Sequence, residues 1–90
     1  MRERKHVVIP HSFAPILWSY DIAALDVMRD RETIIAQAVN YGTLHHWRWL
    51  VAQYGRAELA ARIAAMPASA IRPRARRLAL LLFDGRSYVP

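Results

Sequence analysis

Four arginines near the C-terminal end are the main candidates for binding an anion: Arg72, Arg74, Arg76 and Arg77. They lie at the start of a helix predicted over residues 73–83, where Pro73 suits the first helical position. The positive end of the helix macrodipole disfavours arginines there, so helix stability does not explain them. Guanidinium groups beside unpaired backbone N–H groups form a good site for phosphate or carboxylate. We expect nucleic-acid or anion contacts at these arginines; the alternative is a solvated basic surface that maintains solubility.

The remaining polar residues do not form a pattern typical of catalysis. His45 and His46 are adjacent, so on a helix they point about 100° apart and cannot both face one metal ion. Asp26, Asp30 and Glu32 suit the positive end of a predicted helix. The alternative is a pair of catalytic carboxylates, but no other catalytic group accompanies them. The chain has no cysteine and no Gly-rich phosphate loop. We expect no metal, no cofactor and no enzymatic activity.

Apolar residues off the predicted core faces are candidates for contacting a partner protein. Residues 78–83 are apolar all round, so we expect burial on nearly every side, part of it against another protein. Trp49 lies off the apolar stripe of its helix, beside His45, so it either packs under another element or contacts a partner. We favour packing, under the N-terminal segment, and keep Trp49 as a candidate partner contact. The predicted partner contacts are Trp49, His45, Leu81, Leu82 and Phe83.

Two Tyr-Gly pairs, Tyr41-Gly42 and Tyr54-Gly55, define the helices that position these residues. Glycine after the last helical residue commonly adopts the left-handed conformation that ends a helix. Thr43 is a suitable N-cap for the helix between the two pairs. The apolar stripe of that helix is Leu44, Trp47, Leu50, Val51 and Tyr54.

The sequence predicts an all-α bundle of four main helices, over about 27–41, 44–54, 56–66 and 73–83. A short helical turn capped by Asp21 is expected near 21–25. Trp18 and Leu25 are expected to pack onto the bundle. The inward faces predicted for the first and third helices are Ile34, Ile35, Ala38, Val39 and Tyr41, and Leu59, Ile63 and Met66.

Ninety residues with a 54% hydrophobic composition predict one folded domain, over 12–85. Residues 1–11 are expected to form a basic, partly ordered arm, and 86–90 a short tail. No apolar run is long enough to cross a bilayer, so we expect a cytoplasmic protein. Residues 1–45 contain five basic and five acidic side chains, whereas 46–90 contain eight and two, so the second half carries the whole net charge of +6. This asymmetry favours a polyanionic or acidic partner.

A resemblance covering about residues 17–83 rests on short motifs: Trp18-Ser-Tyr-Asp21, Leu25-Asp26, Arg31, Ile34-Ile35, Tyr41-Gly42, Trp47-Arg48-Trp49-Leu50 and Tyr54-Gly55. In this pattern the chain resembles a family of small bacterial and archaeal proteins of unknown function. Members are often encoded beside nucleotidyltransferase-like toxins of the AbiEii type, so the resemblance implies an antitoxin-like partner protein. Where that family carries a Lys-Thr pair early in its last helix, this chain has Arg74 to Arg77.

Two functions follow as hypotheses. The first is a non-enzymatic, antitoxin-like protein that binds and neutralises a nucleotidyltransferase toxin. The second is a DNA-binding regulator, in which helices 56–66 and 73–83 form a helix-turn-helix-like pair and the four arginines contact phosphates. The six-residue connector containing Pro67 counts against the second, because the usual turn has three or four residues. A membrane-surface role ranks last, since the basic residues are too localised.

Overall fold

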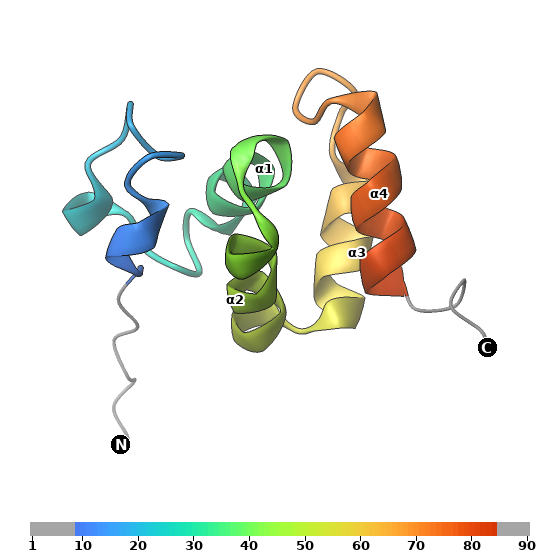
Figure 1. Ribbon diagram of the computed structural model, residues 1–90, viewed down its shortest axis with the longest axis horizontal. Helices are drawn as coiled ribbons and strands as arrows, with labels where there is room; N and C mark the ends of the chain where they lie inside the picture. The colour runs from blue at the N-terminus through green and yellow to red at the C-terminus, as the bar shows by residue number, and fades with distance from the viewer. Residues whose placement is uncertain (1–8, 85–90) are drawn as a thin grey trace.

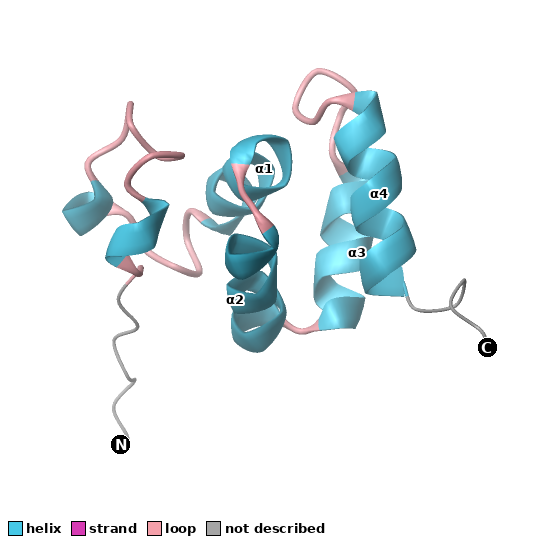
Figure 2. Ribbon diagram, in the orientation of Figure 1, coloured by secondary structure: helices cyan, strands magenta, loops and turns pink. Residues whose placement is uncertain are grey.

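The computed structural model describes residues 9–84, and every element in that part of the chain is helical (Figures 1 and 2). The predicted all-α class is therefore confirmed. The elements are two 3₁₀ turns, η1 (His11–Phe13) and η2 (Ile22–Ala24), and four α-helices, α1 (Arg31–Tyr41), α2 (Leu44–Tyr54), α3 (Arg56–Ala65) and α4 (Pro73–Asp84).

The four helices enclose one core, and the N-terminal segment closes one side of it. In Figure 1, η1 and η2 lie on one side of α1 and α2, and α3 and α4 lie on the other. α3 and α4 pack against each other and run antiparallel. Residues from every helix and from the N-terminal segment are buried, with Phe13, Leu17, Ile34, Ile35, Leu50, Leu59, Ile63 and Ile71 the largest fully buried side chains.

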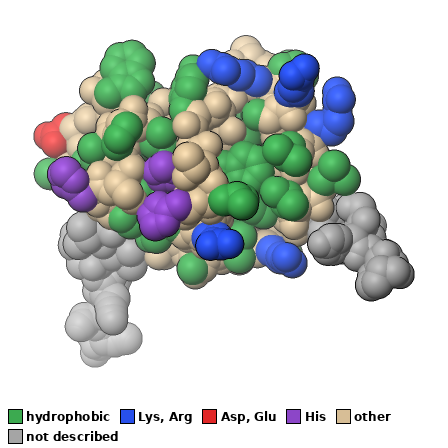
Figure 3. All heavy atoms as spheres, in the orientation of Figure 1, with side chains coloured by type: hydrophobic (Ala, Val, Ile, Leu, Met, Phe, Trp, Pro, Cys, Tyr) green, Lys and Arg blue, Asp and Glu red, His purple; other side chains and the backbone are tan. Residues whose placement is uncertain are grey.

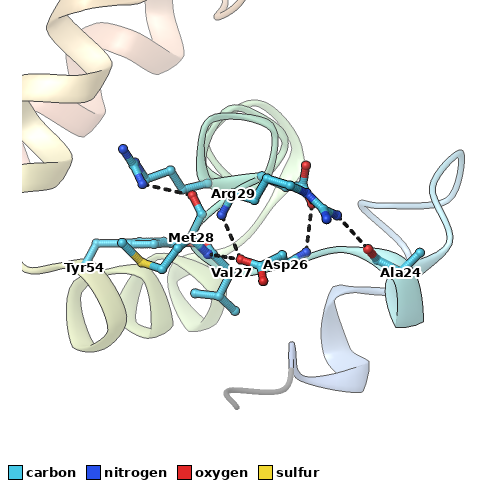
Figure 4. A network of polar contacts seen from close by, with 8 residues as sticks. Ala24, Asp26, Val27, Met28, Arg29 and Tyr54 are labelled. Carbon is cyan, nitrogen blue, oxygen red and sulfur yellow. Dashed lines mark hydrogen bonds and ion pairs between the residues drawn. The ribbon is translucent and has the colours of Figure 1, made fainter. Parts of the chain in front are cut away.

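The predicted bounds agree with the structure for α2, and to within one residue for α3 and α4. α1 begins at Arg31 rather than near residue 27, because Asp26 organises a separate turn before it. The Asp26 carboxylate accepts hydrogen bonds from the backbone N–H groups of Met28, at 2.9 Å, and Arg29, at 2.8 Å. The Asp30 carboxylate accepts from the Asp26 N–H at 2.8 Å, which closes the turn (Figure 4). Short acidic side chains commonly hold turns in this way.

The two Tyr-Gly corners require glycine for different reasons. Gly55 has a φ of 89° and a ψ of 149°, in a region that side chains strongly disfavour. Gly42 has a φ of −86°, so the predicted left-handed conformation is wrong there. Instead, a Cβ atom on Gly42 would lie 2.6 Å from the carbonyl oxygen of Ala38. The first corner therefore depends on close approach and the second on backbone conformation.

Most of the predicted core is buried, and three aromatic or aliphatic exceptions lie at the surface. Trp18 is 74% exposed, so its predicted place in the core is wrong; Ile16 and Leu17 take the inward positions of that bend. Tyr41, at the end of α1, is exposed beneath the guanidinium of Arg72, 4.6 Å from its ring centre. Leu44, at the start of α2, is 57% exposed. All three lie at bends or helix ends, where helical spacing is a poor guide to burial.

The predicted N-terminal arm and C-terminal tail lie largely outside the described residues. Residues 1–8 and 85–90 are not described. Ile9, at the end of the predicted arm, is buried in the core. Asp21 caps η2 as predicted, accepting a hydrogen bond from the N–H of Ala23 at 3.2 Å.

Candidate protein-binding surface

The outward side of α4 carries three exposed leucines, which we call the α4 face: Leu78 (51% exposed), Leu81 (50%) and Leu82 (41%). The prediction that residues 78–83 are buried on nearly every side is therefore wrong for this chain on its own. The bundle covers only the side of α4 that carries Ala79 and Phe83. Leu78, Leu81 and Leu82 are spaced i, i+3 and i+4, so they form one continuous stripe.

An open groove of about 350 Å³ adjoins this stripe, between α2 and α4; we call it the α2/α4 groove. Its lining residues are Leu44, Trp47, Arg48, Val51, Arg56, Leu82 and Phe83. Hydrophobic side chains gather across this part of the molecule, with basic side chains above and below them (Figure 3). The groove is therefore apolar in the middle and basic at its margin.

The deepest part of the groove is held rigid by two buried aromatic rings. Trp47 and Phe83 pack against each other with ring centres 5.5 Å apart. The indole N–H of Trp47 donates to the carbonyl oxygen of Ala38 at 2.8 Å, which fixes the ring's orientation. A fixed apolar surface loses little conformational entropy when a ligand covers it.

Arg48 and Arg56 at the margin of the groove were not among the predicted site residues. Both are exposed, and neither forms an ion pair with the side chains that the structure describes. The spacing of Leu44, Arg48 and Val51 places them on one face of α2 and was the available signal. The sequence did not indicate which element would lie opposite that face.

The four predicted arginines do not form a single cluster. Arg76 points into the protein, and its guanidinium donates to the carbonyl oxygens of Ile63, Met66 and Pro67, the last two at 2.9 Å. Ile63 lies in the last turn of α3, and Met66 and Pro67 follow that helix, so Arg76 adds side-chain hydrogen bonds where α3 ends. From the sequence, the arginines did not stabilise the start of α4. In the structure, Arg76 stabilises a different helix end, the C-terminal end of α3.

The other three arginines are exposed. Arg72 lies over Tyr41, and its backbone N–H donates to the side chain of Asn40 at 2.9 Å. Arg74 and Arg77 stand one helical turn before Leu78 and Leu81. The outward side of α4 thus begins basic and ends apolar.

Trp49 and His45 lie apart from the α4 face. Trp49 is half-buried, and its ring packs edge-on against Phe13, with centres 5.0 Å apart, and near Tyr54. This arrangement agrees with the favoured interpretation, in which Trp49 packs under the N-terminal segment. His45 is exposed, with Nε2 3.3 Å from the hydroxyl of Ser12. Of the predicted partner contacts, Leu81 and Leu82 are exposed together, and Phe83 is buried beneath them.

His46, which drew no functional expectation beyond the metal argument, joins α2 to the N-terminal segment. Its Nδ1 accepts a hydrogen bond from the backbone N–H of Thr43 at 2.9 Å. Its Nε2 lies 2.8 Å from the carbonyl oxygen of Ser12. Because Nδ1 is an acceptor, the neutral ring carries its proton on Nε2 and donates to Ser12. At Thr43, the predicted N-cap of α2, the backbone N–H is thus bonded to the imidazole of His46.

The carboxylates considered for catalysis have structural partners. Hydrogen bonds from the N–H groups of Arg29 and Met28 hold the pKa of Asp26 below its usual value. The guanidinium of Arg29, 2.7 Å from the Asp30 carboxylate, lowers the pKa of Asp30 in the same way (Figure 4). Glu32 pairs with Arg62 at 3.2 Å. All three carboxylates are therefore engaged in the turn before α1 or in an ion pair to α3.

Residues 9–84 contain no group of three or more side chains placed to hold a metal ion. None of the helices in this described part is long and apolar enough to span a membrane.

The fold and this surface define a small all-α protein with an apolar face and a basic margin. The chain belongs to a family of unknown function (DUF6922), whose model matches residues 13–63. The matched region runs from the last residue of η1 to residue 63 within α3, so the expected resemblance of the last helix lies outside it. Searches among curated proteins and among solved structures gave no match.

Proposed function

We propose that this protein acts by binding another protein, without catalysis of its own. The α4 face carries the proposal, because three leucines from one helix side are at least two-fifths exposed. Scattered exposed leucines are ordinary, but a contiguous apolar patch with a polar border is typical of an interaction site. The α2/α4 groove extends this patch, so a partner would cover both.

An antitoxin-like role is the form of this function that we propose. The candidate partner is a nucleotidyltransferase-type toxin, as the family resemblance in the motifs from Trp18 to Gly55 implies. The excess of positive charge in residues 46–90 supports an acidic partner surface. The proposed site of action is the cytoplasm, where such a toxin would be neutralised.

Affinity capture from native cells tests the proposal, with Leu81→Glu as the informative variant. We expect wild-type protein to retain a stoichiometric protein partner, particularly the product of an adjacent gene. Leu81→Glu should lose it, because a carboxylate would be buried in the apolar interface. Met28→Glu is the matched control, since Met28 is also an exposed apolar residue but lies outside the α4 face and the groove.

Capture of the same partner by the wild type and Leu81→Glu would contradict the assignment of the α4 face. A wild-type protein that captures no protein, and stays monomeric beside the product of the adjacent gene, would contradict the proposed function. Circular dichroism of each variant establishes that a loss of capture is not a loss of folding.

DNA binding is the second candidate, favoured by the exposed Arg74 and Arg77 near the start of α4. The antiparallel packing of α3 and α4, joined by residues 66–72, differs from a helix-turn-helix, whose helices cross at about 90–120°. Two phosphate contacts would give a log–log salt slope of roughly −1.8 on duplex DNA. Titration of labelled duplex DNA at several salt concentrations tests this candidate, and a flat response would remove it.

A further inference from the structure

We infer that the α2/α4 groove accepts an amphipathic helix of a partner protein whose apolar stripe is bordered by acidic residues. This inference rests on the proposed function and specifies the partner's contacting segment. The groove lies between two helices and is open along one side, which is the usual geometry for receiving a third helix.

The apolar lining matches a helical ligand in its composition and in its spacing. Leu44 and Val51 are seven residues apart on α2, which is two helical turns, and Leu82 lines the groove from α4. Leu78, one turn before Leu82, extends the apolar surface along α4 outside the groove. A ligand helix with apolar residues at i, i+3 or i+4, and i+7 would meet side chains from both walls. The rigid pair Trp47 and Phe83 forms the bottom between them.

Charge identifies the ligand as acidic. Arg48 and Arg56 line the groove itself. Arg74 and Arg77 lie on the same side of α4 as the leucines, one turn N-terminal to Leu78 and Leu81. The acidic side chains that form ion pairs in the described residues are Asp30, Glu32 and Glu58, and they pair with Arg29 and Arg62, outside the groove. Carboxylates on a partner helix would form charge-assisted hydrogen bonds with Arg48 and Arg56.

A second copy of this chain is a poorer occupant. Two copies meeting through this face would bring the same arginines from each chain to one interface. Like charges opposed across an interface disfavour that pairing. A net charge of +6 per chain adds to the repulsion.

The test uses the full chain and two designed 18-residue helical peptides with the same leucine stripe. One carries glutamates beside the stripe, and the other carries lysines at those positions. We expect the glutamate peptide to bind at least about tenfold more tightly, and to change the fluorescence of Trp47. The double variant Arg48→Glu, Arg56→Glu should reverse this preference, while Leu82→Ser should weaken binding of the glutamate peptide.

The control is Arg72→Glu, which reverses an exposed charge outside the groove and should leave the preference intact. The inference is overturned if the full chain binds both peptides equally or neither, or if the Arg48 and Arg56 variant keeps the wild-type preference. The inference is also overturned if the glutamate peptide binds a chain ending at Asp84 but not the full chain. In that case the natural occupant of the groove would be the chain's own C-terminal residues. A dimer of the full chain that Leu82→Ser dissociates would assign the groove to a second copy.

The result is separable from the proposed function. Suppose that Leu81→Glu loses the cellular partner, whereas the Arg48→Glu, Arg56→Glu variant captures it as strongly as the wild type. The proposed function would then stand, and the inference of an acidic ligand helix would be rejected. A peptide preference that reverses as expected, with no cellular partner captured, would retain the groove's specificity and remove the present assignment of function.

Discussion

At the scale of single residues, two glycines in identical Tyr-Gly pairs have unlike roles. Gly55 adopts a backbone conformation that is nearly exclusive to glycine, and no atom would contact an added Cβ. Gly42 has an ordinary backbone conformation, and its Cβ position is filled by the carbonyl oxygen of Ala38. The positions of both corners were predicted correctly from the sequence. The need for glycine at Gly42 was not, because it depends on how closely the folded chain approaches Ala38 and His46 there.

Alanine at either glycine should destabilise the protein. We expect Gly55→Ala to cost about 1–3 kcal/mol of unfolding free energy through backbone strain. Gly42→Ala should cost a similar amount, on the order of 1–3 kcal/mol, because the backbone must move to relieve a 2.6 Å contact. Urea denaturation measures both, with the exposed Ser69→Ala as a control that should change stability by less than about 0.5 kcal/mol. An unchanged midpoint for Gly42→Ala would contradict the close approach.

Tyr54 gives the fold an alkaline limit. Burial raises the pKa of Tyr54 from 10.0 to about 12, and its hydroxyl donates to the carbonyl oxygen of Val27 at 2.7 Å. A raised pKa in the folded state means that the unfolded chain loses this proton first. The contribution of Tyr54 to stability is therefore complete below pH 10 and is lost as the pH rises towards about 12.

Comparison with Tyr54→Phe isolates this effect from the titration of other groups. At pH 8 the variant should be less stable by about 0.5–1.5 kcal/mol, because it lacks one hydrogen bond. The difference between the two proteins should shrink between pH 10 and pH 12. Guanidinium denaturation at a series of pH values gives both curves. A difference that stays constant over this range would show that the hydroxyl titrates alike in the folded and unfolded chains.

At the scale of elements, α3 and α4 depend on each other through a side chain that looked like a surface charge. Arg76 caps the end of α3 from within α4. Arg77, its neighbour, is exposed and makes no described hydrogen bond. Four arginines that are equivalent by composition thus divide into one structural cap and three outward side chains.

Arg76→Ala should therefore be much more damaging than Arg77→Ala. Hydrogen bonds to a charged group are each worth about 1.5–3 kcal/mol. The variant removes the bonds from the Arg76 guanidinium to the carbonyl oxygens of Ile63, Met66 and Pro67. We expect a loss of at least about 2 kcal/mol for Arg76→Ala and less than about 0.5 kcal/mol for Arg77→Ala. Thermal unfolding followed by circular dichroism compares them. Equal melting temperatures would contradict the cap.

Helix positions were predictable because glycine and proline mark their ends, and the buried faces of α1 and α3 follow helical spacing. Residue 27 was a poor estimate for the start of α1, since the side chain of Asp26 forms a turn that periodicity does not reveal. The α4 face was partly visible as the apolar run 78–83. Arg48 was not identified, because only the tertiary structure places it beside Leu82.

At the scale of the whole molecule, the family region and the folded unit do not coincide. The family model matches residues 13–63. The core continues beyond it, through Ile71, Ala79 and Phe83. Without these residues, the inner side of α3 and the ring of Trp47 would be exposed to water. A match to part of a small domain therefore does not mark an independently stable part.

A chain ending at Pro67 should consequently fail to fold cooperatively. It would lose the burial of Phe83 and Ile71, and each such loss costs about 2–5 kcal/mol in a packed core. It would also lose the Arg76 cap, and the whole stability of a small domain is only about 5–15 kcal/mol. We expect calorimetry to show no unfolding peak for this chain, and a chain ending at Asp84 to keep the peak of the full protein. A cooperative transition in the shorter chain would mean that the core folds without α4. The exposed leucines would then lie on a helix that can separate from the rest of the domain.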